Sequence, residues 1–160
     1  MRYLTYFDGP IDSDALRRTL ERRFGIPPSA VYVGRLEDRP VTADRPVVVV
    51  TLPEGPGGFR WTLMGDRELA EATGLSELDL ARVLAHELNL RALVDDGTNH
   101  PDRWILVARD GSHGPVIVDE DAANEGDLRI VYAEVPIPGE PDIRLRLNGY
   151  HGKEAPGAIR

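Results

Sequence analysis

The sequence predicts an α+β fold in which two main helices pack on a mainly antiparallel sheet. Two stretches with the apolar spacing of a helix are each followed by several strand-like runs. Short segments rich in Gly and Pro separate neighbouring runs, as hairpin loops do. The chain has 160 residues, 41% of them hydrophobic, which suits a single domain with a substantial core.

The first half of the chain predicts a strand, a helix and three further strands. Residues 2–7 alternate as a strand does, and Ser13 is placed to cap a helix that runs to about Phe24. Leu16 and Leu20 join Phe24 in one apolar stripe with a spacing of four residues. The strand-like runs that follow span residues 30–36, 46–52 and 59–64. The loop between the last two lacks the Gly-Lys-Ser/Thr ending of a phosphate-binding loop.

The second half repeats this order of helix and strands. A short helix over residues 66–73 stops at Gly74, and Ser76 begins a longer helix that runs to about Leu90. Strand-like runs follow at residues 91–94, 103–109, 116–118 and 128–133, and residues 143–147 could add an edge strand. This similarity between the two halves has two possible explanations: a βαβββ-αβββ pseudo-duplication, or two unrelated amphipathic helices.

We expect residues 1–150 to form one domain and residues 151–160 to be a C-terminal tail. The residues expected in the core carry the helix stripes and the inward positions of a central strand. They are Leu16, Leu20, Phe24, Leu84, Leu88, Ile105 and Val107.

Composition excludes several classes of protein. The chain has no cysteine, so disulfides, thiolate metal sites and a cysteine nucleophile are excluded. Its longest apolar run, residues 47–50, is far shorter than a membrane-spanning helix, and its first residues lack the features of a signal peptide. Lys153 is the only lysine among 19 basic residues, a usage typical of GC-rich coding. We expect a cytoplasmic, bacterial protein with no membrane partner.

Negative charge is concentrated in one part of the chain. The formal net charge is −8, and residues 95–127 contain nine acidic residues against two arginines. If the runs 103–109 and 116–118 form a hairpin, its strands are antiparallel. The residues after 118 then lie at the same end of the hairpin as the residues before 103. The carboxylates that we expect at this acidic end are Asp95, Asp96, Asp102, Asp119, Glu120, Asp121, Glu125 and Asp127.

Crowded like charges cost stability, and a bound basic partner or cation would offset that cost. The sequence contains no recognisable catalytic constellation and indicates no cofactor. We therefore predict a non-enzymatic interaction protein whose acidic surface binds a basic partner protein. An immunity or antitoxin protein that masks the nucleic-acid-binding surface of a toxin would have these properties.

A second interpretation is a small enzyme or ligand-binding protein that uses the acidic end, His100 and a divalent metal ion. Carboxylate oxygens suit Ca²⁺ or Mg²⁺. The known metal motifs are incomplete, however, and predict no specific metal ligands. Residues 119–130 depart from the EF-hand pattern at Ala123 and Asn124, and Leu90 stands where an HExxH motif beginning at His86 needs its second histidine.

A third interpretation is DNA binding. Residues 69–84 resemble a helix-turn-helix motif, with Gly74 in the turn and a second amphipathic helix after it. A recognition helix presents its first residues to the DNA, where phosphate contacts dominate affinity. Here those residues are Ser76, Glu77 and Asp79. We therefore predict no nucleic-acid partner.

Overall fold

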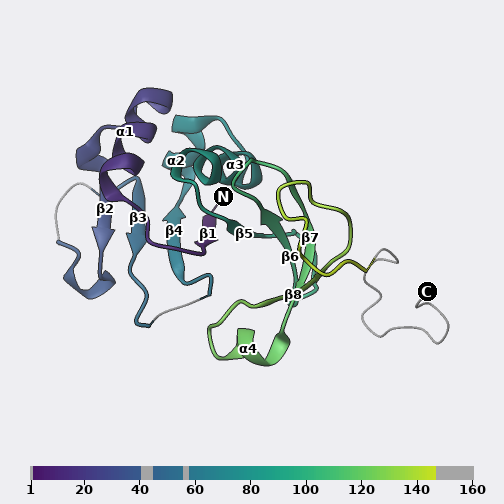
Figure 1. The fold of residues 1–160 in the computed structure, drawn as a ribbon. Coiled ribbons are helices and arrows are strands. Elements are labelled where there is room, and N and C mark those ends of the chain that lie inside the picture. Colours follow the sequence, from purple (N-terminus) through teal and green to yellow (C-terminus); the bar gives the residue numbers. More distant parts are fainter. Residues whose placement is uncertain (1, 41–44, 56–57, 147–160) are drawn as a thin grey trace.

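The computed structural model describes residues 2–40, 45–55 and 58–146. Within these ranges the chain forms four α-helices packed against one eight-stranded sheet, so the predicted α+β class is confirmed (Figure 1). The predicted tail lies outside the described residues. Among the helices that are described, none has the length and apolar character needed to cross a membrane.

The helices are α1 (Ser13–Phe24), α2 (Arg67–Thr73), α3 (Glu77–Leu88) and α4 (Glu120–Asn124). The strands are β1 (Tyr3–Phe7), β2 (Val31–Gly34), β3 (Val48–Thr51), β4 (Trp61–Gly65), β5 (Ala92–Asp95), β6 (Arg103–Val107), β7 (His113–Val118) and β8 (Ile130–Ala133). Two short 3₁₀ turns, at Pro28–Ala30 and Leu36–Asp38, flank β2.

The sheet order is β2-β3-β4-β1-β5-β6-β7-β8, with β1 near the centre. All neighbouring strands are antiparallel except β2 and β3, which are parallel. The pseudo-duplication is not confirmed. The strand after α1 pairs in parallel with its successor, whereas the strand after α3 begins an antiparallel series from β5 to β8.

The helix ends follow local rules, with one correction to the sequence prediction. The cap of α1 is Asp12, whose carboxylate accepts hydrogen bonds from the amides of Asp14 and Ala15, and Ser13 is the first residue of the helix. An aspartate one position earlier competes with serine because both side chains bind orphan amides equally well. Ser76 caps α3 as expected, through the amide of Asp79.

The first core lies between the helices and one face of the sheet. Four predicted core residues, Leu16, Leu20, Leu84 and Val107, are buried there. The other three are partly buried and pack against this core: Phe24, Leu88 and Ile105. Contacts between α1 and α3, and from α3 to β1 and β5, hold the helices to the sheet.

A second core lies on the opposite face, over β5 to β8, and was not predicted. Leu93 of β5 and Leu106 of β6 are fully buried there, because Phe59, Leu128 and Ile137 from non-strand segments cover them. The predicted strand over residues 59–64 therefore begins only at Trp61. Successive side chains of a strand point to opposite faces of the sheet. The central strands therefore contribute to both cores, since apolar side chains cover both of their faces.

The outer strand β8 gains a short partner. Leu145 forms a parallel bridge with Ala133, and the amides of Ala133 and Arg146 take part in the hydrogen bonds. Of the edge strand expected over residues 143–147, the described residues form only this one bridge at Leu145.

Candidate functional site

The acidic end is formed where β6 begins and β7 ends. The carbonyl of Asp102 accepts a hydrogen bond of 2.8 Å from the amide of Val118, and the amide of Asp119 donates one of 2.7 Å to Arg129. Across the neighbouring pair, Asp95 is the register partner of Trp104. The segments 95–102 and 119–129 are therefore adjacent, as the hairpin geometry predicted.

Four of the eight predicted acidic residues are partly buried. Three of these four form hydrogen bonds or ion pairs within the protein. Asp96 accepts hydrogen bonds from the amide and hydroxyl of Thr98 and lies 3.7 Å from the Arg103 guanidinium. Asp119 caps α4 through the amides of its first turn. Asp127 forms an ion pair with Arg129 at 2.8 Å. Each of these three carboxylates is therefore engaged in a contact within the protein.

Asp102 is the fourth half-buried carboxylate. Its Oδ1 atom is buried and has no hydrogen-bond partner among the described residues. The other half of the predicted set is exposed: Asp95, Glu120, Asp121 and Glu125. Asp95 accepts the amide of Gly97. The other three are on or next to α4, and within the described part of the chain their side chains form no ion pair or hydrogen bond.

Helix α4 was not predicted, because residues 119–127 were assigned to no helix or strand. It lies away from α1, α2 and α3, beyond the ends of the strands that precede and follow it (Figure 1). Asp119 supplies the cap, Ala122 is buried beneath the helix, and the acidic residues face outward. A helix of five residues leaves little periodicity in a sequence, so its signal was weak.

The metal interpretation predicted convergent ligands at the same end. In the part of the chain that is described, no group of three or more His, Asp or Glu side chains is arranged to hold a metal ion. His100 is exposed in the loop between β5 and β6, next to Pro101.

The turn between α2 and α3, where the helix-turn-helix motif was noted, packs on the sheet. The hydroxyl of buried Tyr3 donates a hydrogen bond to the carbonyl of Leu75. The carboxylate of Glu77, the first residue of α3, is half-buried and hydrogen-bonded by the backbone of Leu4. Both contacts hold the start of α3 against β1.

Glu77 also has an unusual environment for an acid. Burial raises the pKa of its carboxyl to about 7, and the nearby negative charge of Asp95 adds to the effect, against the lowering by the Leu4 hydrogen bond. Its Oε1 atom is buried and has no hydrogen-bond partner among the described residues.

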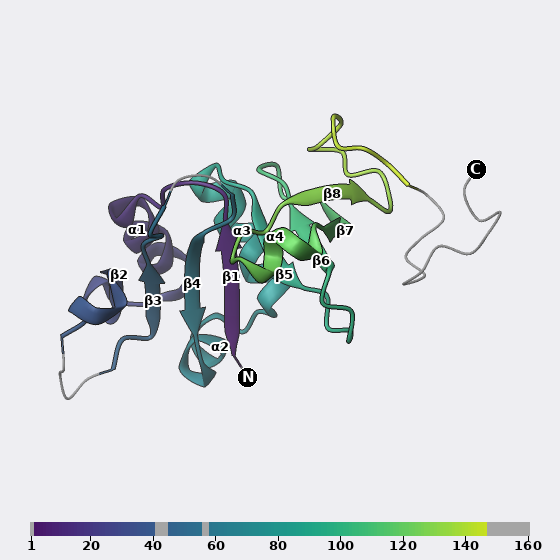
Figure 2. The same cartoon turned by 90° about the horizontal axis from the view of Figure 1, so that it is seen from below.

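A pocket on the other half of the sheet is basic, and sequence reasoning missed it. Its floor lies on the face of the sheet opposite the first core. Met64 of β4 is the register partner of Leu4 on one side and Val49 on the other, so the three side chains form a row. In Figure 2 the strands β3, β4 and β1 lie in front of α1 and α3. The pocket volume is about 470 Å³.

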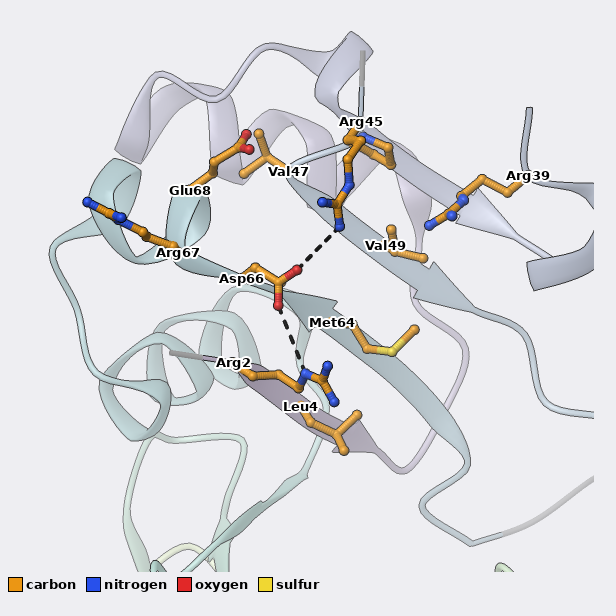
Figure 3. A pocket seen from close by; sticks show the side chains of 12 residues that line it. Arg2, Leu4, Arg39, Arg45, Val47, Val49, Met64, Asp66, Arg67 and Glu68 are labelled. Atoms are coloured by element: carbon orange, nitrogen blue, oxygen red, sulfur yellow. Dashed lines mark ion pairs between the residues drawn. The ribbon is translucent and has the colours of Figure 1, made fainter. Parts of the chain in front are cut away.

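Arginines surround this floor. Arg2, Arg39, Arg45 and Arg67 line the pocket, with Asp66 and Glu68 as its only acidic lining residues among those described. Figure 3 shows Asp66 between Arg2 and Arg45, with Arg39 on the far side of the floor. Arg67 turns away and pairs with Glu71 at 2.9 Å.

The basic pocket left no signal in the sequence, because its arginines are separated by many residues and alternate with acids. Arg39 directly follows the acidic pair Glu37 and Asp38, Arg45 directly follows Asp44, and Arg2 stands alone near the N-terminus. Only the strand order brings them together, since β1 lies next to β4 and β4 next to β3.

Comparisons with family models, with curated proteins and with solved structures find no match to this chain.

Proposed function

We propose that the protein is a non-enzymatic interaction domain of the cytoplasm that binds a basic partner protein through its acidic end. One observation carries the proposal. Glu120, Asp121 and Glu125 lie exposed at α4, and none of them is paired within the described structure. Uncompensated surface charge of one sign steers a partner of opposite sign and raises its association rate.

The position of α4 supports the same function. Asp119 caps the helix and buried Ala122 anchors it, so the acidic side chains project from a fixed support. A fixed charged helix presents its carboxylates without the cost of ordering a loop on binding. Bacterial immunity and antitoxin proteins that mask a basic toxin surface need a surface of this kind, and we propose a role of that type.

The proposal predicts which carboxylates contribute to binding. The exposed residues at α4 should set the association rate, whereas Asp96, Asp119 and Asp127 should contribute mainly to folding because they are bound internally. This division refines the sequence prediction, which treated all eight carboxylates as equivalent.

The test measures the rate at which a fluorescent nona-arginine peptide associates with the protein at low and at moderate salt. The binding variant is Glu120→Gln, Asp121→Asn, Glu125→Gln. The control variant, Asp14→Asn, Glu21→Gln, Glu54→Gln, makes the same charge change at exposed residues elsewhere. We expect the binding variant to associate roughly tenfold more slowly, with a weaker dependence on salt, and the control to change about twofold or less.

Equal losses in the two variants would contradict the proposal. They would mean that the peptide responds to net charge alone and that α4 is not a binding surface. Fast association that is unaffected by either variant would also contradict it.

A further inference from the structure

The arginine-rimmed pocket is separate from the acidic end and suits a ligand of the opposite charge. It lies on β1, β3 and β4, whereas the acidic end lies on β5 to β8 and α4. Four arginines and two acidic residues line it, in a protein whose net charge is −8. A basic concave site on an acidic protein concentrates anions locally, because the guanidinium charges are close and the distant carboxylates are screened.

The guanidinium groups at the rim are incompletely compensated. The Asp66 carboxylate is shared by Arg2 at 3.9 Å and Arg45 at 3.6 Å, and both arginine side chains are 80% exposed. These distances are longer than a direct charged hydrogen bond of about 2.8 Å. Among the described residues Arg39 makes no ion pair. Each of the three groups can therefore donate hydrogen bonds to an added anion.

Asp66 itself is placed for this arrangement. It precedes α2 at the cap position, where an aspartate side chain usually accepts a backbone amide. Here its carboxylate makes no such bond and is directed to the two arginines instead, as Figure 3 shows. The acid holds Arg2 and Arg45 on the same side of the pocket without neutralising both.

The floor of the pocket is apolar, so a ligand that fits the pocket needs an apolar part. Leu4, Val49 and Met64 form a row across three strands, and Val47 extends it. Met64 is half-buried and can adapt its unbranched side chain to different shapes. The volume of about 470 Å³ lies within the range of roughly 300–1,000 Å³ that is usual for small-molecule sites.

We propose that this pocket binds a small amphipathic anion, with its apolar body on Leu4, Val49 and Met64 and its carboxylate or phosphate between Arg39 and Arg45. An arginine fork can hold two oxygens of either anionic group, so both groups share the recognition chemistry. Inorganic phosphate would satisfy the guanidinium groups but leave the apolar floor exposed to water. The apolar body is therefore part of the recognition.

The first test uses two fluorescent probes that differ in one group. Anilinonaphthalene sulfonate has an apolar ring system and an anionic group, and phenylnaphthylamine has the ring system alone. We expect the sulfonate to bind the full chain at least about tenfold more tightly than the neutral probe. Equal affinity for the two probes, or no binding of the sulfonate, would overturn the proposal.

Variants place the binding at this pocket. Arg39→Gln with Arg45→Gln should weaken binding of the sulfonate about tenfold and leave the neutral probe unaffected. The matched control is Arg18→Gln with Arg22→Gln on α1, which removes the same charge from the helix-covered side of the sheet. Met64→Ser should weaken both probes, because it removes apolar contact. Equal effects of the two arginine pairs would contradict the assignment.

Competition identifies the anionic group and the need for an apolar body. Decanoate and decyl phosphate should each displace the sulfonate probe, and inorganic phosphate at the same concentration should not. Displacement by only one of the two alkyl anions would support the pocket and name its ligand class. Displacement by inorganic phosphate as effectively as by decyl phosphate would overturn the amphipathic requirement.

Discussion

The acidic end at α4 and the basic pocket on β1, β3 and β4 carry opposite charge, and they differ in how the fold holds it. At the acidic end, Asp96, Asp119 and Asp127 are bound by a turn, a helix cap and an ion pair. In the pocket, Arg2 and Arg45 share one carboxylate at distances above 3.5 Å. Many acidic residues close together in a sequence therefore need not all be available at the surface. Arginines that are dispersed in a sequence can nevertheless form an accessible site.

The difference has a local physical cause. Aspartate side chains are short and bind nearby amides, as Asp95, Asp96 and Asp110 do with residues two positions later. Arginine side chains are long and donate only, so exposed arginines on separate strands find partners only where a carboxylate lies within reach. Asp66 is within reach of two of them at once.

The largest expected effect is on the stability of the hydrophobic core that supports both regions. Leu84 of α3 is 1% exposed in the first core, and Leu84→Ala should lower the free energy of unfolding by about 2–5 kcal/mol. Leu36→Ala, at a residue that is 55% exposed, is the control and should cost less than about 0.5 kcal/mol. Urea unfolding of both variants measures the difference. A loss below about 1 kcal/mol for Leu84→Ala would mean that α3 does not pack as described.

A smaller effect separates internally bound acids from those free to bind a partner. Glu134 is buried and pairs with Arg103 at 2.8 Å, so Glu134→Gln should cost about 1.5–3 kcal/mol of stability. Glu120→Gln on α4 should change stability by less than about 0.5 kcal/mol, because Glu120 is exposed and unpaired within the described structure. Thermal or urea unfolding compares the two. Similar costs would remove the distinction between bound and available carboxylates.

The smallest expected effect concerns Glu77, which lies between the two regions at the start of α3. Burial and Asp95 raise the pKa of its carboxyl from the ordinary 4.5 to about 7. The folded protein therefore binds an extra proton between these values, and its stability should fall as the pH rises from about 4.5 through 7. The contribution is on the order of 1 kcal/mol, because solvent screens a half-exposed group.

Glu77→Gln tests this pH dependence, since its carbonyl can still accept the Leu4 amide while the titration is removed. Urea midpoints of the wild type should be lower at pH 8 than at pH 5, and the variant should show a smaller decrease. Parallel decreases in the two proteins would assign the pH dependence to other groups.

Sequence reasoning predicted the elements with long periodic patterns and missed those that depend on pairing. The apolar stripe of α1 predicted a helix and the strand-like run at residues 103–109 predicted a strand; the structure contains α1, and β6 over Arg103–Val107. Phe59 was placed in a strand, because its role in covering Leu93 and Leu106 depends on the second core. The adjacency of the carboxylates was predictable from one hairpin, since hairpin geometry is local. The arginine pocket was not, because it requires the order β3-β4-β1.

NMR spectroscopy can test most directly whether the protein has two separate binding regions of opposite charge. Amide chemical shifts of the full chain would be followed by NMR during titration with the arginine peptide and, separately, with anilinonaphthalene sulfonate. We predict that the peptide shifts the amides of Glu120, Asp121 and Glu125, and that the sulfonate shifts those of Leu4, Val49 and Met64. Overlapping sets of shifted amides, or peptide-induced shifts spread over all acidic surfaces without a maximum at α4, would contradict it.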